Sequence, residues 1–180
     1  MDLQPLDART GPHLEWRERE PFGRDYELRC AHRVFANMVL SAAKGSPASV
    51  RTASSEWTFE RAGFPVKRVV VRERGANHVT ALFRPLVPGK GTLLHRGGAR
   101  HRWGAGAPWR RTSGFRDESG AELVKFALGV PAQSLTDLVK IQATVTVTSA
   151  SDPPGALPLL CCLGFYLLIP ERGASLHPAW

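Results

Sequence analysis

The sequence predicts a mainly β protein, in which a closed antiparallel barrel of about twelve strands surrounds one buried, hydrophobic C-terminal helix. Two observations predict this fold. Short alternating or β-branched apolar runs, separated by Gly, Pro and Asn, fill most of residues 26–149. An apolar segment with no polar face, ALPLLCCLGFYLLI, then occupies residues 156–169. With 180 residues, the chain is long enough for one hydrophobic core and too short for two.

Residues 1–25 are expected to form a flexible N-terminal arm, because Pro, Gly and charges of both signs occur there without a sustained apolar period. The barrel domain is expected to cover residues 26–170, beginning at the alternation that starts with Tyr26, and to be followed by a tail at 171–180. Within it, the segment 34–43 (VFANMVLSAA) fits either a helix or a strand.

Strands dominate the rest of the domain. Five apolar residues at strict period two, with Lys, Gln and Thr between them, predict the clearest strand at 139–147. Residues 115–126 are expected to form a hairpin with its turn at 117–120, and residues 85–91 are expected to break a strand. Further strands are expected near residues 57–59, 66–72, 79–83, 93–94 and 103, with turns at 75–77 and 97–98.

We expect residues 156–169 to be a helix that protein surrounds on all sides. Pro158 suits its first turn, and Pro170 ends it. A membrane anchor is less favoured, because these residues span about 21 Å as a helix and a hydrocarbon core is roughly 30 Å thick. The segment is also too long and too rich in Leu for a single buried strand. The side chains expected at the centre are Leu157, Leu159, Leu160, Leu163, Phe165, Tyr166, Leu167 and Leu168.

Only a closed sheet can surround a helix when nearly all other elements are strands. A helix with its side chains is about 10–12 Å wide, and the side chains of an eight-stranded barrel already fill its interior. A larger barrel is therefore needed. Residues 26–149 suffice for about twelve strands at roughly ten residues per strand and turn.

The formal net charge of +8 is concentrated in residues 50–125, which hold fifteen Lys or Arg and six Asp or Glu. Such a patch favours polyanionic partners. Its densest part is 95–111 (HRGGARHRWGAGAPWRR), which holds two Trp and no acid. Basic side chains beside exposed aromatic ones suit a lipid interface or single-stranded nucleic acid. Alternatively, Trp103 and Trp109 point into the barrel and the arginines are ordinary outer-face residues.

No catalytic or metal-binding motif is present. The six histidines lack metal-ligand spacing, and the three cysteines form no disulfide framework. Residues 89–92 (GKGT) lack the spacing of a phosphate-binding loop. No basic leader with an apolar stretch opens the chain. We therefore expect a cytoplasmic, non-enzymatic protein that needs no cofactor or metal.

The order of these features resembles the tubby-like superfamily, which includes the tubby C-terminal domain, the phospholipid scramblases and the LURP-one-related proteins. The likeness covers roughly residues 26–170. It rests on the 157–170 run (LPLLCCLGFYLLIP), which resembles the closing helix of small LURP-one-like members, and on the order of the features before it: Trp57-Thr58-Phe59, Ala81-Leu82-Phe83, Gly97-Gly98 leading to Trp103, and the 115–126 hairpin.

The resemblance implies a barrel around a central helix and, from tubby domains, recognition of phosphoinositide headgroups by basic surface residues. No individual lipid-binding residue of tubby matches a position in this chain. Scramblases are assigned lipid movement and a calcium response, but this chain has neither their acidic calcium loop nor their cysteine cluster, so scramblase activity is not expected.

The function predicted from the sequence is a non-enzymatic module that binds an anionic ligand, best identified as phospholipid headgroups at a membrane surface. The alternative is a scaffold that binds nucleic acid or protein through the same basic surface, and insertion of residues 156–169 into a membrane ranks third. A monomer is assumed. The candidate ligand-binding residues are Arg96, Arg100, Arg102, Trp103, Trp109, Arg110, Arg111, Lys67, Arg68, Arg72 and Arg74.

Overall fold

A computed structural model describes residues 2–7, 13–20, 23–43, 45–63, 67–76, 78–106, 112–129, 142–148 and 156–169. These residues form twelve strands and one helix. In chain order they are β1 (His13–Glu18), β2 (Asp25–Cys30), β3 (Arg33–Leu40), β4 (Ala48–Thr52), β5 (Glu56–Ala62), β6 (Arg68–Glu73), β7 (Val79–Val87), β8 (Lys90–His95), β9 (Arg100–Ala105), β10 (Thr112–Arg116), β11 (Glu122–Leu128), β12 (Gln142–Val147) and α1 (Ala156–Leu168).

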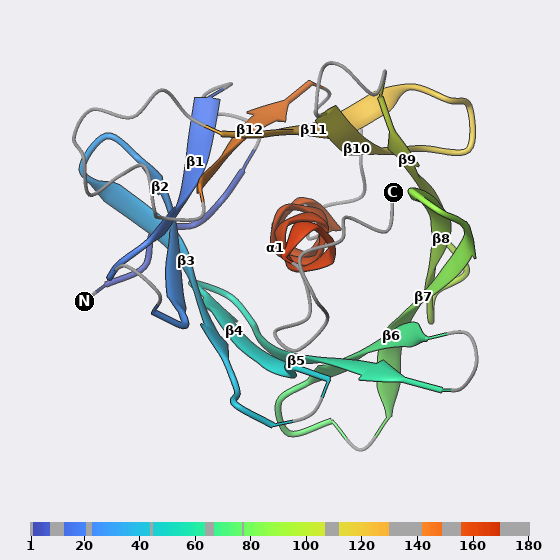
Figure 1. The fold of residues 1–180 in the computed structure, drawn as a ribbon, viewed down its shortest axis with the longest axis horizontal. Coiled ribbons are helices and arrows are strands. Elements are labelled where there is room, and N and C mark those ends of the chain that lie inside the picture. The colour runs from blue at the N-terminus through green and yellow to red at the C-terminus, as the bar shows by residue number, and fades with distance from the viewer. Residues whose placement is uncertain are drawn as a thin grey trace.

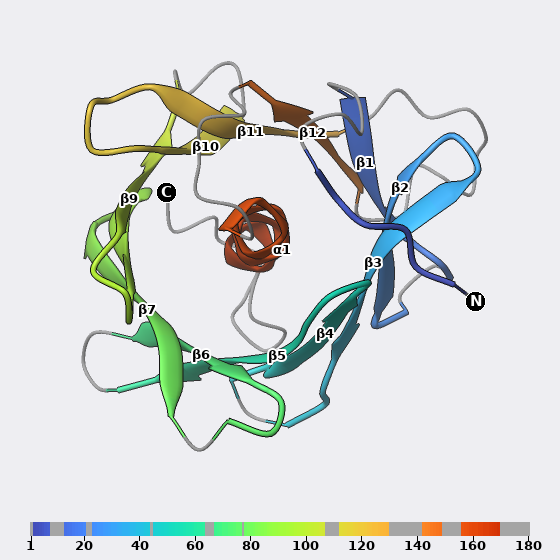
Figure 2. The ribbon, with the colours of Figure 1, turned by 180° about the vertical axis from the view of Figure 1, so that it is seen from behind.

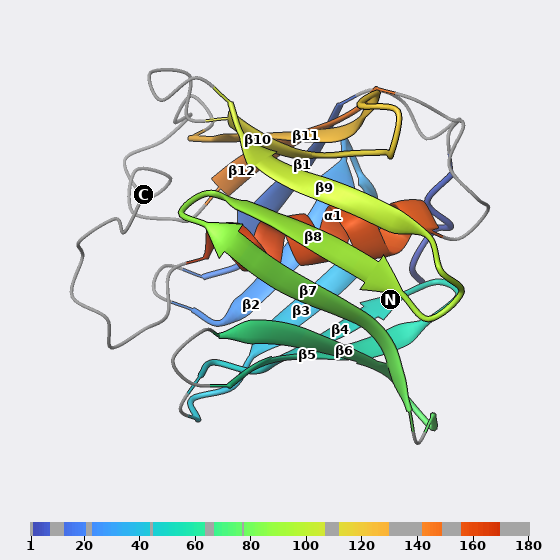
Figure 3. The same cartoon turned by 90° about the vertical axis from the view of Figure 1, so that its right-hand side faces the viewer.

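The twelve strands form one closed antiparallel barrel, in which each strand pairs with its neighbours in sequence and β1 pairs with β12. Closure pairs every strand on both sides, so the sheet has no exposed edge. Seen along the barrel, α1 runs through the interior (Figure 1), and the same arrangement is seen from behind (Figure 2). The side view shows the helix enclosed along its length by the tilted strands (Figure 3).

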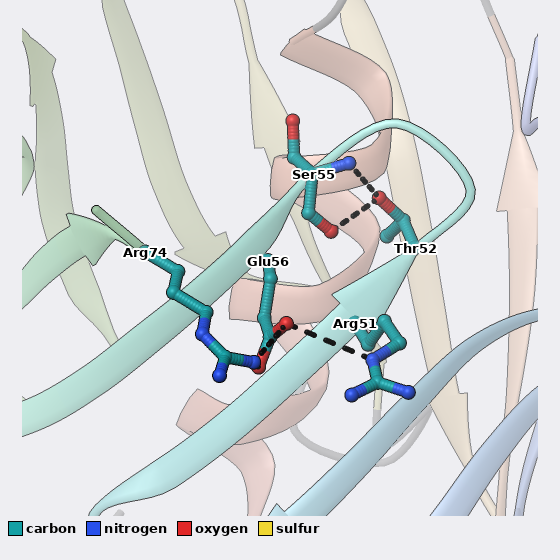
Figure 4. Close-up of polar contacts among 5 residues, drawn as sticks. All are labelled: Arg51, Thr52, Ser55, Glu56 and Arg74. Carbon is teal, nitrogen blue, oxygen red and sulfur yellow. Dashed lines mark hydrogen bonds and ion pairs between the residues drawn. The ribbon is translucent and has the colours of Figure 1, made fainter. Parts of the chain in front are cut away.

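The alternation of buried and exposed residues along the strands decides what faces the helix. In β4, Ala48, Val50 and Thr52 are buried, whereas Ser49 and Arg51 are exposed. The β4–β5 turn is closed by Thr52, whose hydroxyl donates to the carbonyl of Ser55 at 2.9 Å and accepts from its amide at 3.1 Å (Figure 4). The inner face of β4 is therefore apolar apart from Thr52, whose hydroxyl bonds within its own turn.

Helix α1 is hydrophobic all round because barrel side chains contact every face of it. Phe165 stacks on Trp16 of β1 at 4.6 Å between ring centroids, and the Trp16 indole Nε1 donates to the Cys161 carbonyl at 3.2 Å. Gly164 has to be glycine, because a Cβ there would lie 2.2 Å from Cζ of Phe126. The ring of Phe126 therefore lies directly against the backbone of α1 at Gly164.

The C-terminal end of α1 is held by an arginine of the barrel. Arg61 on β5 donates from Nη2 to the carbonyls of Tyr166 and Ile169, at 2.9 and 3.1 Å, and lies 4.3 Å from the centroid of the Tyr166 ring. The Tyr166 hydroxyl in turn donates to the carbonyl of Ser46 at 3.0 Å. These bonds satisfy carbonyl groups that every helix leaves unpaired in its last turn.

The structure confirms the twelve-stranded barrel and the C-terminal helix predicted from the sequence. Of the central side chains, Leu157 and Leu167 are partly buried against the core. The others are buried, with at most 8% of their surface exposed. The 115–126 hairpin is also present, and Ser119 Oγ donates to Asp117 across its turn at 2.6 Å, which lowers the pKa of that carboxyl. The ambiguous segment 34–43 is mostly strand β3.

Two expectations are corrected. The stretch 1–25, expected as an arm, contains strand β1, which closes the barrel, so the barrel begins at His13 and not at Tyr26. Leu14 and Trp16 face the core there. Their alternation was not recognised in the sequence because charged residues surround them. The break expected at 85–91 is shorter than predicted, since β7 continues to Val87 and β8 begins at Lys90, which leaves only Pro88 and Gly89 between the strands. A shift of register between Pro85 and Val87 accommodates the proline.

The strand predicted at 139–147 is confirmed for Gln142–Val147, where Ala143 and Val145 are buried. Val139 and Ile141 lie outside the described residues, as do Asn77 of the predicted 75–77 turn and the predicted tail at 171–180.

Substitution of Leu160 by Asp should abolish soluble folding, because Leu160 is 0% exposed and a carboxylate there would be buried without a partner. We expect the free energy of unfolding to fall by more than about 4 kcal/mol. A urea titration followed by tryptophan fluorescence tests this, because a variant that does not fold shows no unfolding transition. Thr58→Asp, on the exposed face of β5, is the control and should keep a midpoint near that of the wild type. A folded Leu160→Asp protein with an unchanged midpoint would contradict the central position of α1.

Thiol titration provides a second test of the buried helix. Cys161 and Cys162 are 0% exposed, and burial raises the pKa of both thiols well above the ordinary value, whereas Cys30 is partly exposed. We expect a disulfide reagent at pH 8 to modify one thiol per native chain and three after unfolding in urea. A Cys30→Ser variant should show no reactive thiol before unfolding. Rapid modification of Cys161 or Cys162 in the native protein would show that α1 is accessible.

Candidate anion-binding face

Four adjacent strands carry no acidic residue. No Asp or Glu lies between Glu73 and Asp117, and this stretch contains all of β7, β8, β9 and β10, which are consecutive around the barrel. Every charged side chain on these strands is therefore basic. This part of the outer barrel surface is the candidate functional site, and we call it the β7–β10 face.

The register of the strands places arginines in one row across this face. Arg84 on β7 is opposite Thr92 on β8, Thr92 is opposite Arg102 on β9, and Arg102 is opposite Arg116 on β10. The neighbouring residue on each strand faces the core; these buried residues are Phe83, Leu93, Trp103 and Phe115. Because side chains alternate along a strand, the row of arginines points outward.

The exposed cations of the β7–β10 face are poorly neutralised. Arg84, Lys90, Arg100 and Arg102 are exposed, and none makes an ion pair within the part of the chain that the structure describes. Arg116 lies 3.8 Å from Glu122 on the neighbouring strand. Like charges directly opposite each other on paired strands are destabilising, so Arg102 beside Arg116 does not serve the fold.

Arg72 on β6 and Arg74 in the turn after it are in a different situation. Arg72 is 3.0 Å from Glu60, and Arg74 is 2.8 Å from Glu56. Figure 4 shows Glu56 between Arg74 and Arg51, which lies on its other side at 3.7 Å. These pairs are exposed and individually weak, but they neutralise the field that Arg72 and Arg74 would offer a ligand. The two residues are therefore less available to an anion than those of the β7–β10 face.

Among the other sequence-predicted residues, Arg100 and Arg102 belong to the face, and Arg96 is exposed in the β8–β9 turn. Lys67 and Arg68 are exposed at the start of β6. Val69 pairs with Phe83, so Arg68 lies beside Arg84 at the border of the face. Trp109, Arg110 and Arg111 lie outside the described residues.

The assignment of Trp103 to a ligand-binding surface is wrong. Its side chain is only 6% exposed and packs inside the barrel, with ring centroids 4.8 Å from Phe115 and 5.7 Å from Phe126. The reason is strand alternation, which turns Trp103 inward wherever Arg100 and Arg102 turn outward. The reading in which Trp103 is a core residue is the one that the structure supports.

Three residues of the face were missed in the sequence: Arg84, Lys90 and Arg116. The search for a dense basic cluster overlooked them because each is a single basic residue outside 95–111, and strand pairing is what brings them onto one face with Arg102. The signal that could have found them is the absence of acid from Arg74 to Arg116, a property of the whole stretch and not of any short motif.

The rest of the described chain offers less to a ligand. A pocket of about 300 Å³ is lined by Arg19, Glu20, Gly23, Arg24 and Asp25, whose charges have both signs. No group of three or more His, Cys, Asp or Glu able to hold a metal occurs among the described residues. His95 and His101 make a pair, 3.0 Å between Nε2 and Nδ1, with His101 buried.

The described helix is too short to cross a bilayer. The chain has no significant match among protein-family models, curated proteins or solved structures. The resemblance to tubby-like proteins therefore stays a prediction. What the structure itself offers for a function is the geometry and charge of the β7–β10 face.

Replacement of Arg102 by Thr should stabilise the protein. It removes the like-charge contact with Arg116, and cross-strand pairs of this kind change the free energy of unfolding by about 0.2–1 kcal/mol. We expect urea unfolding to show an increase of that size at low salt and a smaller one at 1 M NaCl, where charges are screened.

The control is Arg72→Thr, the same exchange at an exposed strand position that has an ion-pair partner. It should lower the free energy of unfolding or leave it unchanged. If Arg102→Thr destabilises the protein as much as Arg72→Thr does, Arg102 contributes to the fold and is not available for a ligand.

Proposed function

We propose that this protein is a non-enzymatic binding module that holds anionic phospholipid headgroups at a membrane surface through the β7–β10 face. The observation that carries the proposal is a group of exposed cations on three adjacent strands, β7, β8 and β9, that have no acidic partner among the described residues: Arg84, Lys90, Arg100 and Arg102. A protein face whose charges are all positive attracts a negatively charged membrane surface, because it presents no acidic group that would repel the lipid phosphates.

The side chains of the face suit phosphate. A guanidinium group presents planar donors that match two phosphate oxygens at once, and three of the four cations are arginines. Each basic residue near an anionic leaflet contributes about 1 kcal/mol. Four such residues correspond to a dissociation constant on the order of 1 mM, so charge alone supports weak and reversible binding. Such binding is that of a peripheral protein, which we propose to be a monomer at the cytoplasmic surface of a membrane.

Phospholipid is favoured over single-stranded nucleic acid because nucleic-acid binding of that kind uses exposed aromatic side chains on which bases stack. The large hydrophobic side chains that are exposed in the described chain are Val39, Val79, Leu86 and Val87, all of them aliphatic. The proposed relationship to tubby-like proteins supports the same choice, since tubby domains bind phosphoinositide headgroups through basic surface residues.

The test is flotation of detergent-free protein with vesicles of phosphatidylcholine, alone or with 30% phosphatidylserine, at 0.1 and 0.5 M NaCl. We expect the wild type to float with the anionic vesicles only, and less at high salt. The double variant Arg84→Glu/Arg102→Glu should bind the anionic vesicles at least tenfold more weakly, because it places two acids in the middle of the face.

The matched control is Arg33→Glu/Arg51→Glu, which changes the net charge equally at exposed positions of β3 and β4. It should bind within about twofold of the wild type. Equal loss in both double variants would show that net charge alone matters. If the wild type does not float but retards a single-stranded oligonucleotide in a gel, the ligand is nucleic acid and the lipid proposal fails.

A further inference from the structure

The tip of the β7–β8 hairpin exposes two adjacent aliphatic side chains. Leu86 is 72% exposed and Val87 55% exposed, and Pro88 beside them is also exposed. The other exposed large hydrophobics of the described chain, Val39 and Val79, are single and less exposed, at 48% and 40%. Scattered apolar residues are normal on a protein surface, whereas an adjacent pair at a projecting tip needs a reason.

The hairpin holds this tip in a fixed position. Phe83 is buried on β7 and packs over Gly91, where a Cβ would lie 2.3 Å from its ring. The Ala105 amide donates to the Gly89 carbonyl at 2.9 Å, which ties the turn to β9. Between these two fixed points the register shifts at Pro85–Val87, and the chain extends beyond the core. Leu86 and Val87 are therefore held in a defined position by an ordered hairpin.

Cations stand on both sides of the pair. Arg84 precedes Leu86 by two residues and Lys90 follows Val87 by three, both are exposed, and neither has an ion-pair partner among the described residues. Arg68 lies beside Arg84 on the neighbouring strand. An apolar centre between cations matches the boundary of an anionic bilayer, where acyl chains lie beneath a layer of phosphates.

We propose that Leu86 and Val87 insert between the headgroups of an anionic bilayer while Arg84 and Lys90 bind the surrounding phosphates. The inference rests on the proposed function and adds to it a point of insertion and an orientation. The β7–β8 tip lies at the end of the barrel where α1 ends (Figure 3), so this end faces the membrane. Apolar insertion also strengthens an association that four surface cations alone would leave weak.

The first experiment uses the same phosphatidylcholine/phosphatidylserine vesicles and removes the apolar pair without changing any charge. We expect Leu86→Ser/Val87→Ser to bind roughly tenfold or more weakly, and the remaining binding to vanish at 0.5 M NaCl, where wild-type binding is only reduced. The matched control, Val39→Ser/Val79→Ser, removes the two other exposed aliphatic side chains and should bind like the wild type.

The outcomes separate the two proposals. If Leu86→Ser/Val87→Ser binds like the wild type while Arg84→Glu/Arg102→Glu does not bind, the face binds headgroups and the insertion is refuted. If the wild type itself does not bind anionic vesicles, the proposed function fails and the insertion fails with it. An equal loss in Val39→Ser/Val79→Ser would also refute insertion at the tip.

The second experiment measures insertion directly. Leu86→Cys in a Cys30→Ser background can be labelled with an environment-sensitive fluorophore, because Cys161 and Cys162 are 0% exposed. On anionic vesicles we expect a blue shift and at least a twofold rise in emission. The same label at Ser49→Cys, exposed on β4, should change little. Unchanged emission at residue 86 of vesicle-bound protein would overturn the inference.

Discussion

The interior of the barrel is the constraint on which the rest of the structure depends. A closed sheet of twelve strands encloses more space than its inward side chains can fill, and water there would leave the apolar inner face hydrated. Helix α1 removes this space. Leu160, Leu163 and Phe165 are 0% exposed inside the barrel. Strand closure and helix burial therefore depend on each other.

Filling the interior also determines where function can be located. The inward residues are committed to packing, and Arg61 of the barrel wall bonds to the helix through the carbonyls of Tyr166 and Ile169. The surfaces that remain available to a ligand are the outer face of the barrel and the tips of its hairpins. On β7–β9 the outer face carries cations that have no acidic partner within the part of the chain that the structure describes, and at the β7–β8 tip it carries Leu86 and Val87.

The candidate site was only partly predictable, because it is defined across strands and not along the chain. Arg100 and Arg102 stand out in a dense basic segment. Arg84 and Arg116 are ordinary in their local sequence, and they join the site only because Thr92 and Arg102 pair with them in register. Trp103 is the opposite case. It lies in the basic segment of the sequence, but its position in the strand turns its side chain into the core.

By itself, the sequence determined the fold class, because side-chain period and helix length are local properties. Strict alternation such as that of Ala143 and Val145 allows a strand, and an apolar segment too short for a bilayer requires protein around it. Only the tertiary structure decided that β1 closes the barrel, that Arg72 and Arg74 are neutralised, and which cations share a face. Pairing between strands sets these relations, and its register depends on which faces are buried and on the turns that join the strands, which no single strand determines.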